Sequence, residues 1–173
     1  LFGIDNAAEK AQTVLRLETR LANAALSNVE LRDPVANYNK MSVEELQKLV
    51  PEVNWEVYFA GMNIAPDSLS VGQVRHLQEA GKMLVEESLE DMKTLFTWQV
   101  IDGSSDFLTE EIFMQNFEFY GRILSGRQEP TPLWKRAVAM VNGTLGEAVG
   151  QMYVEKYFPE ENKERMIALV KNL

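Results

Sequence analysis

Histidine, cysteine and carboxylate side chains are the groups that could hold a metal or transfer protons, and this chain has one histidine and no cysteine. A His2Glu zinc site needs two histidines, so His76 alone cannot build one, and thiolate sites are excluded. Ser-His-Asp catalysis would need a Gly-x-Ser-x-Gly turn, which the sequence lacks. Because His76 lies beside Arg75 and near Glu79, we expect it to be a solvated surface residue.

Carboxylates occur as adjacent pairs at Glu44/Glu45, Glu86/Glu87, Glu90/Asp91, Glu110/Glu111 and Glu160/Glu161. General acid–base catalysis needs a carboxyl group whose pKa is shifted by burial. These pairs fall in the first or last turns of predicted helices. In a first turn, the helix dipole alone favours acidic residues. A carboxylate di-metal bundle would also need a Glu-x-x-His motif, and the sequence has none. We therefore expect no catalytic residue and no metal ligand among them.

Three glycines lie inside a predicted helix, at Gly143, Gly146 and Gly150. No strand precedes them, so they are not a phosphate-binding loop. A glycine inside a helix costs about 1 kcal/mol relative to alanine, and close approach of a second segment is the usual reason to tolerate it. Together with Asn142 they are the candidate residues for close packing or for lining a cavity. Asn142 also begins an Asn-Gly-Thr glycosylation sequon, which a helix interior disfavours, and we expect its side chain to hydrogen-bond a neighbouring segment.

Composition indicates a globular protein with 46% hydrophobic and 25% charged residues. The net charge of −9 disfavours nucleic acids and anionic membranes as partners. No apolar run is long enough to span a bilayer. The chain starts with Leu1 without a signal-peptide pattern, and its last helix lacks a stop signal, so we expect a piece of a longer protein.

Apolar residues at three- to four-residue spacing predict helices over 5–27, 42–49, 54–61, 72–86, 88–102, 109–126, 131–158 and 160–173. The expected N-caps are Asp5, Ser42, Asn54, Ser88, Thr109 and, with proline following, Thr131. Residues 68–71 alternate polar and apolar and are the one expected extended segment.

The helix over 131–158 carries two apolar stripes, one from Leu133 to Met152 and one from Leu145 to Tyr157. Two stripes predict a helix that is buried on more than one side. The final helix is amphipathic, with an inward face that ends at Leu173. Because other strand signals are almost absent, the sequence predicts an all-α fold with a single helical domain over residues 1–173.

One stretch is specific enough to compare with a known family. Leu133-Trp134-Lys135-Arg136, then Met140-Val141-Asn142-Gly143, then Glu147-Ala148-Val149-Gly150-Gln151-Met152-Tyr153-Val154 and Phe158 resemble the N-terminal region of the neprilysin and endothelin-converting-enzyme family. These are zinc metalloendopeptidases, and the bacterial oligopeptidase O group is among them.

Other segments agree with that family in the same order along the chain. They are Leu17-Glu18-Thr19-Arg20-Leu21-Ala22, Arg32-Asp33-Pro34, Tyr38-Asn39-Lys40-Met41, Val43-Glu44-Glu45-Leu46 and Leu95-Phe96-Thr97-Trp98. Ala137 stands where vertebrate relatives have cysteine, which resembles the disulfide-free bacterial branch. The resemblance implies a bacterial protein of the cell envelope, periplasmic or secreted.

The resemblance also implies where the chemistry lies. The family's His-Glu-x-x-His helix, its downstream Glu ligand and its Asn-Ala-x-Tyr strand are absent here, so no catalytic, zinc-binding or cofactor-binding residue carries over to this chain. Zinc is implied only for the full-length parent. The implied partners are the catalytic lobe of the same polypeptide and short peptide substrates. This region would form part of the helical lobe that restricts access to the active site, with Asn142 and the three glycines packing between lobes or lining the cavity.

A second function stays open, namely a free-standing, non-catalytic helical binding module. Such a module should have a polar surface, whereas a lobe cut from a larger enzyme should expose an apolar patch where its partner packs. The exposed surface of a structure therefore separates the two hypotheses.

Overall fold

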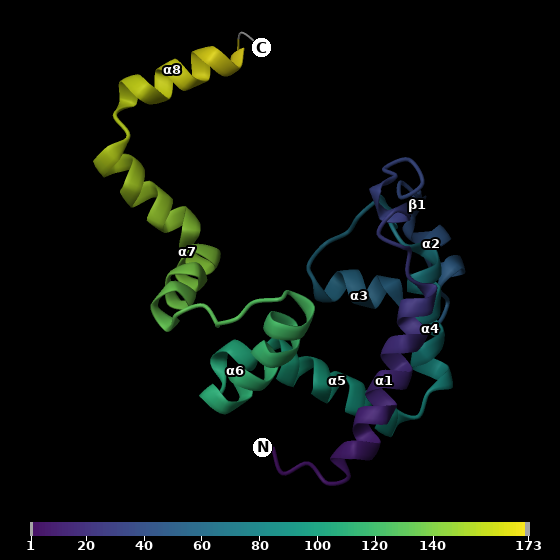
Figure 1. Cartoon of the computed structure of the whole chain (residues 1–173). Coiled ribbons are helices and arrows are strands. Elements are labelled where there is room, and N and C mark those ends of the chain that lie inside the picture. The colour runs from purple at the N-terminus through teal and green to yellow at the C-terminus, as the bar shows by residue number, and fades with distance from the viewer. Residues whose placement is uncertain (1, 172–173) are drawn as a thin grey trace. The chain divides into compact units, whose positions relative to one another are not determined.

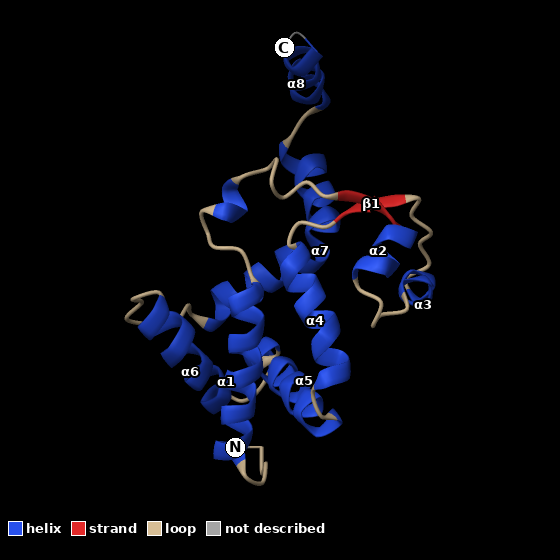
Figure 2. Ribbon diagram, turned by 90° about the vertical axis from the view of Figure 1, so that its right-hand side faces the viewer, coloured by secondary structure: helices blue, strands red, loops and turns tan. Residues whose placement is uncertain are grey.

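The computed structural model describes residues 2–171, and these residues are mainly helical, with one small sheet (Figures 1 and 2). The all-α class is confirmed. The α-helices are α1 (Ala7–Ala24), α2 (Val43–Leu49), α3 (Trp55–Gly61), α4 (Val74–Glu86), α5 (Leu89–Gly103), α6 (Glu110–Asn116), α7 (Leu133–Tyr157) and α8 (Glu160–Lys171). Shorter 3-10 turns cover Glu30–Arg32 and Ser105–Phe107, and a π-helix covers Phe117–Leu124.

Three of the predicted N-caps are confirmed by their hydrogen bonds. Ser42 Oγ accepts from the Glu45 amide at 3.1 Å while the Glu45 carboxylate accepts from the Ser42 amide at 2.7 Å, which completes a capping box. Asn54 Oδ1 accepts from the Val57 amide at 3.0 Å. Ser88 Oγ accepts from the amide of residue 91 at 3.1 Å.

Two predicted caps are wrong. Helix α1 begins after Asn6, which has φ of 54° and makes no side-chain cap, so Asp5 is not the cap. The cap residue of α7 is Pro132, whose extended ψ of 143° places it before the helix rather than in its first turn. The Thr131 hydroxyl instead accepts a hydrogen bond from Arg127 Nη2 at 2.6 Å.

Contacts divide the chain into two compact units, Leu1–Phe113 and Met114–Leu173. The expectation of a single domain over 1–173 stays a prediction. In the first unit, α1 lies beside α4 and α5 (Figure 2). Their meeting faces bury Leu17, Met83, Met92 and Leu95, which are at most 7% exposed. This cluster fixes α1 against α4 and so positions the polar side chains at its edge.

A second core of the first unit holds α2, α3 and the sheet together. It buries Leu46, Val50, Trp55 and Val71, and Trp55 Nε1 donates to the Val50 carbonyl at 3.0 Å. Strand β2 (Ser68–Ser70) confirms the predicted extended segment, and it pairs antiparallel with β1 (Lys40–Ser42). Strand β1 was not predicted, because it follows turn-forming asparagines and its last residue, Ser42, is also the cap of α2.

The second unit departs from the prediction in two respects. The expected helix over 109–126 changes at Phe117 into the π-helix, which ends at Leu124, and Gly126 follows its C-cap residue with φ of 67°. Helix α7 contains no buried residue, so its predicted burial on more than one side is wrong for this chain. Burial needs a neighbouring segment, and no described residue of the unit Met114–Leu173 buries this helix. Helix α8 is likewise exposed, and Leu173 lies outside the described residues.

Candidate functional site

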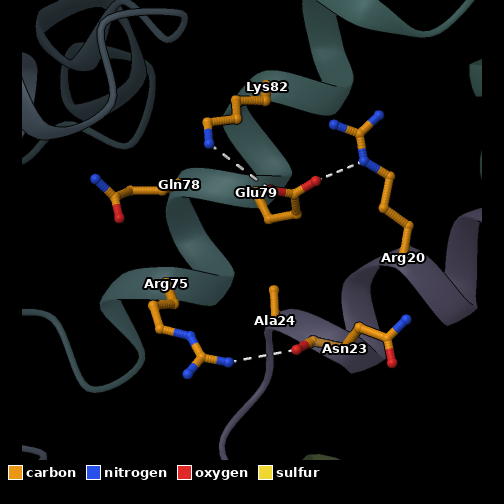
Figure 3. Close-up of a pocket in the computed structure, with 7 residues that line it drawn as sticks. All are labelled: Arg20, Asn23, Ala24, Arg75, Gln78, Glu79 and Lys82. Carbon is orange, nitrogen blue, oxygen red and sulfur yellow. Dashed lines mark hydrogen bonds and ion pairs between the residues drawn. The ribbon is translucent and has the colours of Figure 1, made fainter.

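A shallow polar groove lies between α1 and α4 (Figure 3). Its volume is about 390 Å³. It is lined by Arg20, Asn23, Ala24, Arg75, Gln78, Glu79 and Lys82. The lining residues of α4 recur every three to four positions, so they share the face of the helix that lies toward α1. The groove is therefore a consequence of the α1–α4 packing described above.

Arg20 binds three carboxylates at one end of this groove. Its Nε donates to Glu79 Oε1 at 2.6 Å, its Nη1 to Glu87 Oε1 at 2.6 Å, and its Nη2 to Glu86 Oε2. Glu79 and Glu86 lie two turns apart on α4, and Glu87 is the C-cap residue of that helix. Each guanidinium nitrogen thus has its own carboxylate, an arrangement that suits the planar fork of arginine.

Arg16, one turn earlier on α1, extends the network to α5. Its Nη1 lies 2.8 Å from Glu87 Oε2, and its Nη2 lies 3.1 Å from Asp91 Oδ2 in the first turn of α5. We call Arg16, Arg20 and their four carboxylate partners the α1 ion-pair network. The network was not predicted from the sequence, because residues 59 to 75 positions apart pair only after folding. The only sequence feature that pointed to the network was the pair Arg16 and Arg20, which lie four residues apart and so share one face of a helix.

The network lowers the pKa of two of its carboxylates and raises that of one arginine. The hydrogen bond from Arg20 holds the pKa of Glu79 below its usual value. The hydrogen bond from Arg16, with a further one from Arg20, lowers the pKa of Glu87. The three glutamates in turn raise the pKa of Arg20. A general acid at neutral pH needs a carboxyl pKa raised toward 7, so these shifts have the wrong sign for acid–base catalysis.

The remaining groove residues make weaker contacts. Arg75 Nη2 donates to the Asn23 carbonyl at 3.3 Å, and Lys82 Nζ lies 3.9 Å from Glu79 Oε2 (Figure 3). His76, on the same helix, is half-buried rather than fully solvated, and it is not a lining residue. The groove holds no nucleophile next to a base, so its contacts join helices and supply no reaction chemistry.

The other carboxylate pairs also have structural partners. Glu45 completes the α2 capping box, Glu90 Oε1 lies 2.8 Å from Lys93 Nζ, and Glu160 Oε1 lies 3.1 Å from Lys163 Nζ. The bond from Lys93 lowers the pKa of Glu90. Within residues 2–171, no group of three or more His, Cys, Asp or Glu side chains is placed to hold a metal ion.

The residues predicted to pack closely or line a cavity lie on α7, in the unit that begins at Met114. Asn142 and Gly143 are exposed, and Gly146 and Gly150 are half-buried. A Cβ added at any of these glycines would meet no atom within 4 Å, so no described segment packs on them. Their assignment to lobe packing or cavity lining stays a prediction. Between Gly143 and Gly146, Leu145 has non-helical angles, φ −120° and ψ 16°, which kink the helix.

Residues 1–173 match the N-terminal family model whose description is peptidase family M13. The chain belongs to peptidase family M13. The match covers the whole chain, including α7 with its Trp-Lys-Arg and Val-Gly-x-x-Tyr-Val motifs. The resemblance to the neprilysin and endothelin-converting-enzyme family is therefore confirmed.

Named relatives of this M13 chain are much longer than 173 residues. It is 28% identical over 192 residues to neprilysin-2 of Drosophila melanogaster, a match that covers 100% of this chain and 25% of that protein. It is 24% identical over 179 residues to endothelin-converting enzyme-like 1 of Mus musculus, covering 100% and 23%. The M13 chain thus spans about a quarter of these relatives.

Solved structures agree with the sequence matches. The zinc metalloprotease Zmp1 of Mycobacterium tuberculosis in its open state is 34% identical, with a TM-score of 0.86 over 95% of this chain and 26% of that one. Zmp1 in complex with an inhibitor is 33% identical, with a TM-score of 0.81 over 95% of this chain and 25% of that one.

Among residues 2–171, every helix is too short or too polar to span a bilayer.

Proposed function

We propose that this M13 chain is the N-terminal, non-catalytic part of a zinc metalloendopeptidase that cleaves short peptides. The observation that carries the proposal is the match of residues 1–173 to peptidase family M13. The similarity to Zmp1, a zinc metalloprotease by its description, supports it at 33–34% identity. In this proposal the catalytic lobe of the same polypeptide supplies the reacting groups.

The residues of this chain do not fit the zinc that the family implies. One histidine and no cysteine cannot complete a catalytic zinc site of known type. The described carboxylates form no cluster that could substitute, because those of the α1 ion-pair network are already bound to arginine. We therefore assign zinc to residues outside this chain and derive no reaction step from the residues present.

We further propose that the chain forms part of a helical lobe that limits access to the active site. Excluding large substrates requires a rigid wall rather than ionisable groups. The cross-helix ion pairs and the buried cluster of α1, α4 and α5 support such rigidity. The exposed apolar residues of α7 favour a lobe that packs against more polypeptide over a free-standing binding module with a polar surface.

The test compares this chain with the protein encoded by its complete gene. The longer protein should contain a His-Glu-x-x-His segment, bind zinc, and cleave a quenched fluorescent peptide of about ten residues in a chelator-sensitive reaction. A folded protein carrying the same peptide sequence in a surface loop should stay uncleaved, because the lobe excludes it. The 173-residue chain should neither bind zinc tightly nor cleave the peptide.

Three results would contradict this proposal. One is a gene that stops at Leu173, and another is peptidase activity in the purified 173-residue chain. A longer protein that cleaves the folded protein as fast as the free peptide would contradict the access-limiting role alone.

A further inference from the structure

Helix α7 is interrupted near its middle. Leu145 has non-helical angles, φ −120° and ψ 16°, so α7 consists of two helical halves, 133–144 and 146–157, which meet at this one residue (Figure 1). Proline is a common cause of a sharp bend in a helix, and α7 contains none. The bend therefore has another physical cause.

Two local features account for the bend. The Thr144 hydroxyl donates to the Met140 carbonyl, four residues earlier, at 2.8 Å, and hydroxyl bonds of this kind often bend a helix. Gly143 and Gly146 lie on the two sides of Leu145, and glycine allows the backbone more conformations than any other residue does. Residues 143–146 are therefore the part of α7 in which the helix changes direction most easily.

Each half of α7 has side-chain contacts of its own. In the first half, Lys135 Nζ lies 5.3 Å from the centroid of the Trp134 ring. In the second half, the centroids of the Tyr153 and Tyr157 rings lie 5.2 Å apart. The halves can turn about Leu145 without breaking these contacts. A hinge has this form, because a few residues absorb the change in φ and ψ while the segments on both sides keep their structure.

The place of the bend along the chain suggests what it could move. The proposed function puts the catalytic lobe after residue 173, so the polypeptide passes through Leu145 on its way from the helices of the first unit to that lobe. Zmp1, 34% identical to this chain, has been solved in an open state and in a partially open state. An enzyme whose lobe limits access has to open to admit a peptide and to release its products.

We propose that residues 143–146 are a hinge in α7, about which the helical lobe swings to open and close the path to the active site. This inference rests on the proposed function, because only the longer protein has an active site to open. The hinge works through the main-chain angles at Leu145 and requires no ionisable group. It also gives the two glycines a role in motion, besides the packing role expected from the sequence.

Distances between pairs of spin labels test the hinge in the protein from the complete gene. The labels are attached to encoded non-natural amino acids, so that cysteines outside this chain do not interfere. One label replaces Gln115, an exposed residue of α6. The second replaces either Lys156, which follows the bend, or Ala139, which precedes it, and both are exposed on α7. The 115–156 pair crosses Leu145, and the 115–139 pair is the matched control that does not.

The two pairs should differ in the spread of their distances. The 115–156 distances should form a broad or two-peaked distribution, because the lobe samples open and closed positions. The 115–139 distances should form a single narrow peak. A hydroxamate peptide that binds the zinc should reduce the 115–156 distribution to one peak, because a closed lobe holds one angle at the bend.

Substitutions at the bend should restrict the motion. Thr144→Val removes the hydroxyl and keeps the shape of the side chain, and Gly146→Ala restricts the backbone. Each should narrow the 115–156 distribution in the absence of inhibitor and lower kcat about twofold or more, since opening then becomes slower. Gly150→Ala changes a glycine of the same helix beyond the bend, so it should affect neither quantity.

Three results would overturn the hinge. A narrow 115–156 distribution with and without inhibitor would show a fixed bend. Equally broad distributions for both pairs would place the motion before α7. Unchanged distributions in folded Thr144→Val and Gly146→Ala variants would show that these residues do not control the angle; if neither variant folds, the two label pairs in the unsubstituted protein decide.

Zinc content and peptide cleavage are measured on the same samples, which separates the two proposals. Cleavage by a protein with a fixed bend contradicts the hinge alone. A longer protein that shows the broad 115–156 distribution but neither binds zinc nor cleaves the peptide contradicts the proposed function.

Discussion

The ring of Phe117 lies directly against the α-carbon of Gly121, four residues later in the π-helix. Both residues are buried, and Phe117 is 5% exposed. The guanidinium carbons of Arg122 and Arg127 lie 5.9 Å and 5.6 Å from the ring centroid, so two cations flank the same ring. The Gly121 carbonyl also accepts from the Arg127 amide at 2.9 Å. The widened helical turn therefore accommodates an aromatic ring over a residue without a side chain.

Replacing Gly121 with alanine should destabilise this part of the chain. The new Cβ would overlap Cδ2 and Cε2 of the Phe117 ring, so the ring must move from its place near the arginines. Overpacking of this kind costs about 1–3 kcal/mol, which outweighs the helix propensity that alanine gains. Urea unfolding followed by circular dichroism should show a lower midpoint.

Gly103→Ala is the matched control, because a Cβ at Gly103 meets nothing within 4 Å. Its midpoint should stay the same or rise slightly. Equal midpoints for both alanine variants would show that the contact between Phe117 and Gly121 does not constrain the fold.

Arg20→Gln should weaken the attachment of α1 to α4. The substitution removes the guanidinium from Glu79, Glu86 and Glu87 and leaves three carboxylates near one another. Their mutual repulsion adds to the lost pairing, so we expect a melting temperature lower by about 2–5 °C. Lys93→Gln breaks one exposed pair with Glu90 and should change the melting temperature by less than half as much. Similar shifts in both variants would mean that Arg20 has no special role.

Acid should weaken the same attachment. The pKa values of Glu79 and Glu87 are lower in the folded chain than in the unfolded chain, where a glutamate titrates near its ordinary value of about 4.3. A lowered carboxyl pKa contributes stability that is complete above the unfolded value and is lost as the pH falls through the folded value. Between pH 7 and about pH 5 these groups should leave the melting temperature unchanged, and below about pH 4.3 they should lower it.

The difference between wild type and Arg20→Gln isolates this effect. It should be constant above about pH 5 and should shrink as the pH falls below about 4.3. A difference that widens in acid would contradict the assignment of the lowered pKa values to the arginine contacts.

How much of the fold was predictable depends on the range of the interactions. The caps at Ser42, Asn54 and Ser88 involve residues three positions apart, so the sequence shows both partners. Arg20 and Glu79 lie 59 positions apart, and only the packing of α1 on α4 brings them together.

Strand β1 and the burial of α7 departed from the prediction for other physical reasons. Strand β1 was not predicted, because its last residue, Ser42, carries the stronger signal of a helix cap. The apolar stripes of α7 are visible in its sequence, but burial depends on a neighbouring segment, and no described residue of the unit Met114–Leu173 buries this helix. Family membership could be predicted from the sequence, because the ordered motifs span the whole chain. The α1 ion-pair network could not, because its partners are far apart in the sequence.

Removing the hydroxyl of Ser42 should destabilise the chain more than removing the hydroxyl of Thr131. Ser42→Ala removes the acceptor for the Glu45 amide and half of the capping box, which should cost about 1 kcal/mol of unfolding free energy. Thr131→Ala removes a hydroxyl that accepts from Arg127 and caps no amide of α7, so it should cost less than about 0.5 kcal/mol. Both are measured by urea unfolding, with tryptophan fluorescence for Ser42→Ala, since Trp55 lies in the α2–α3 core. Equal losses would show that Thr131 caps α7 in solution after all, because only a working N-cap makes the two hydroxyls equivalent.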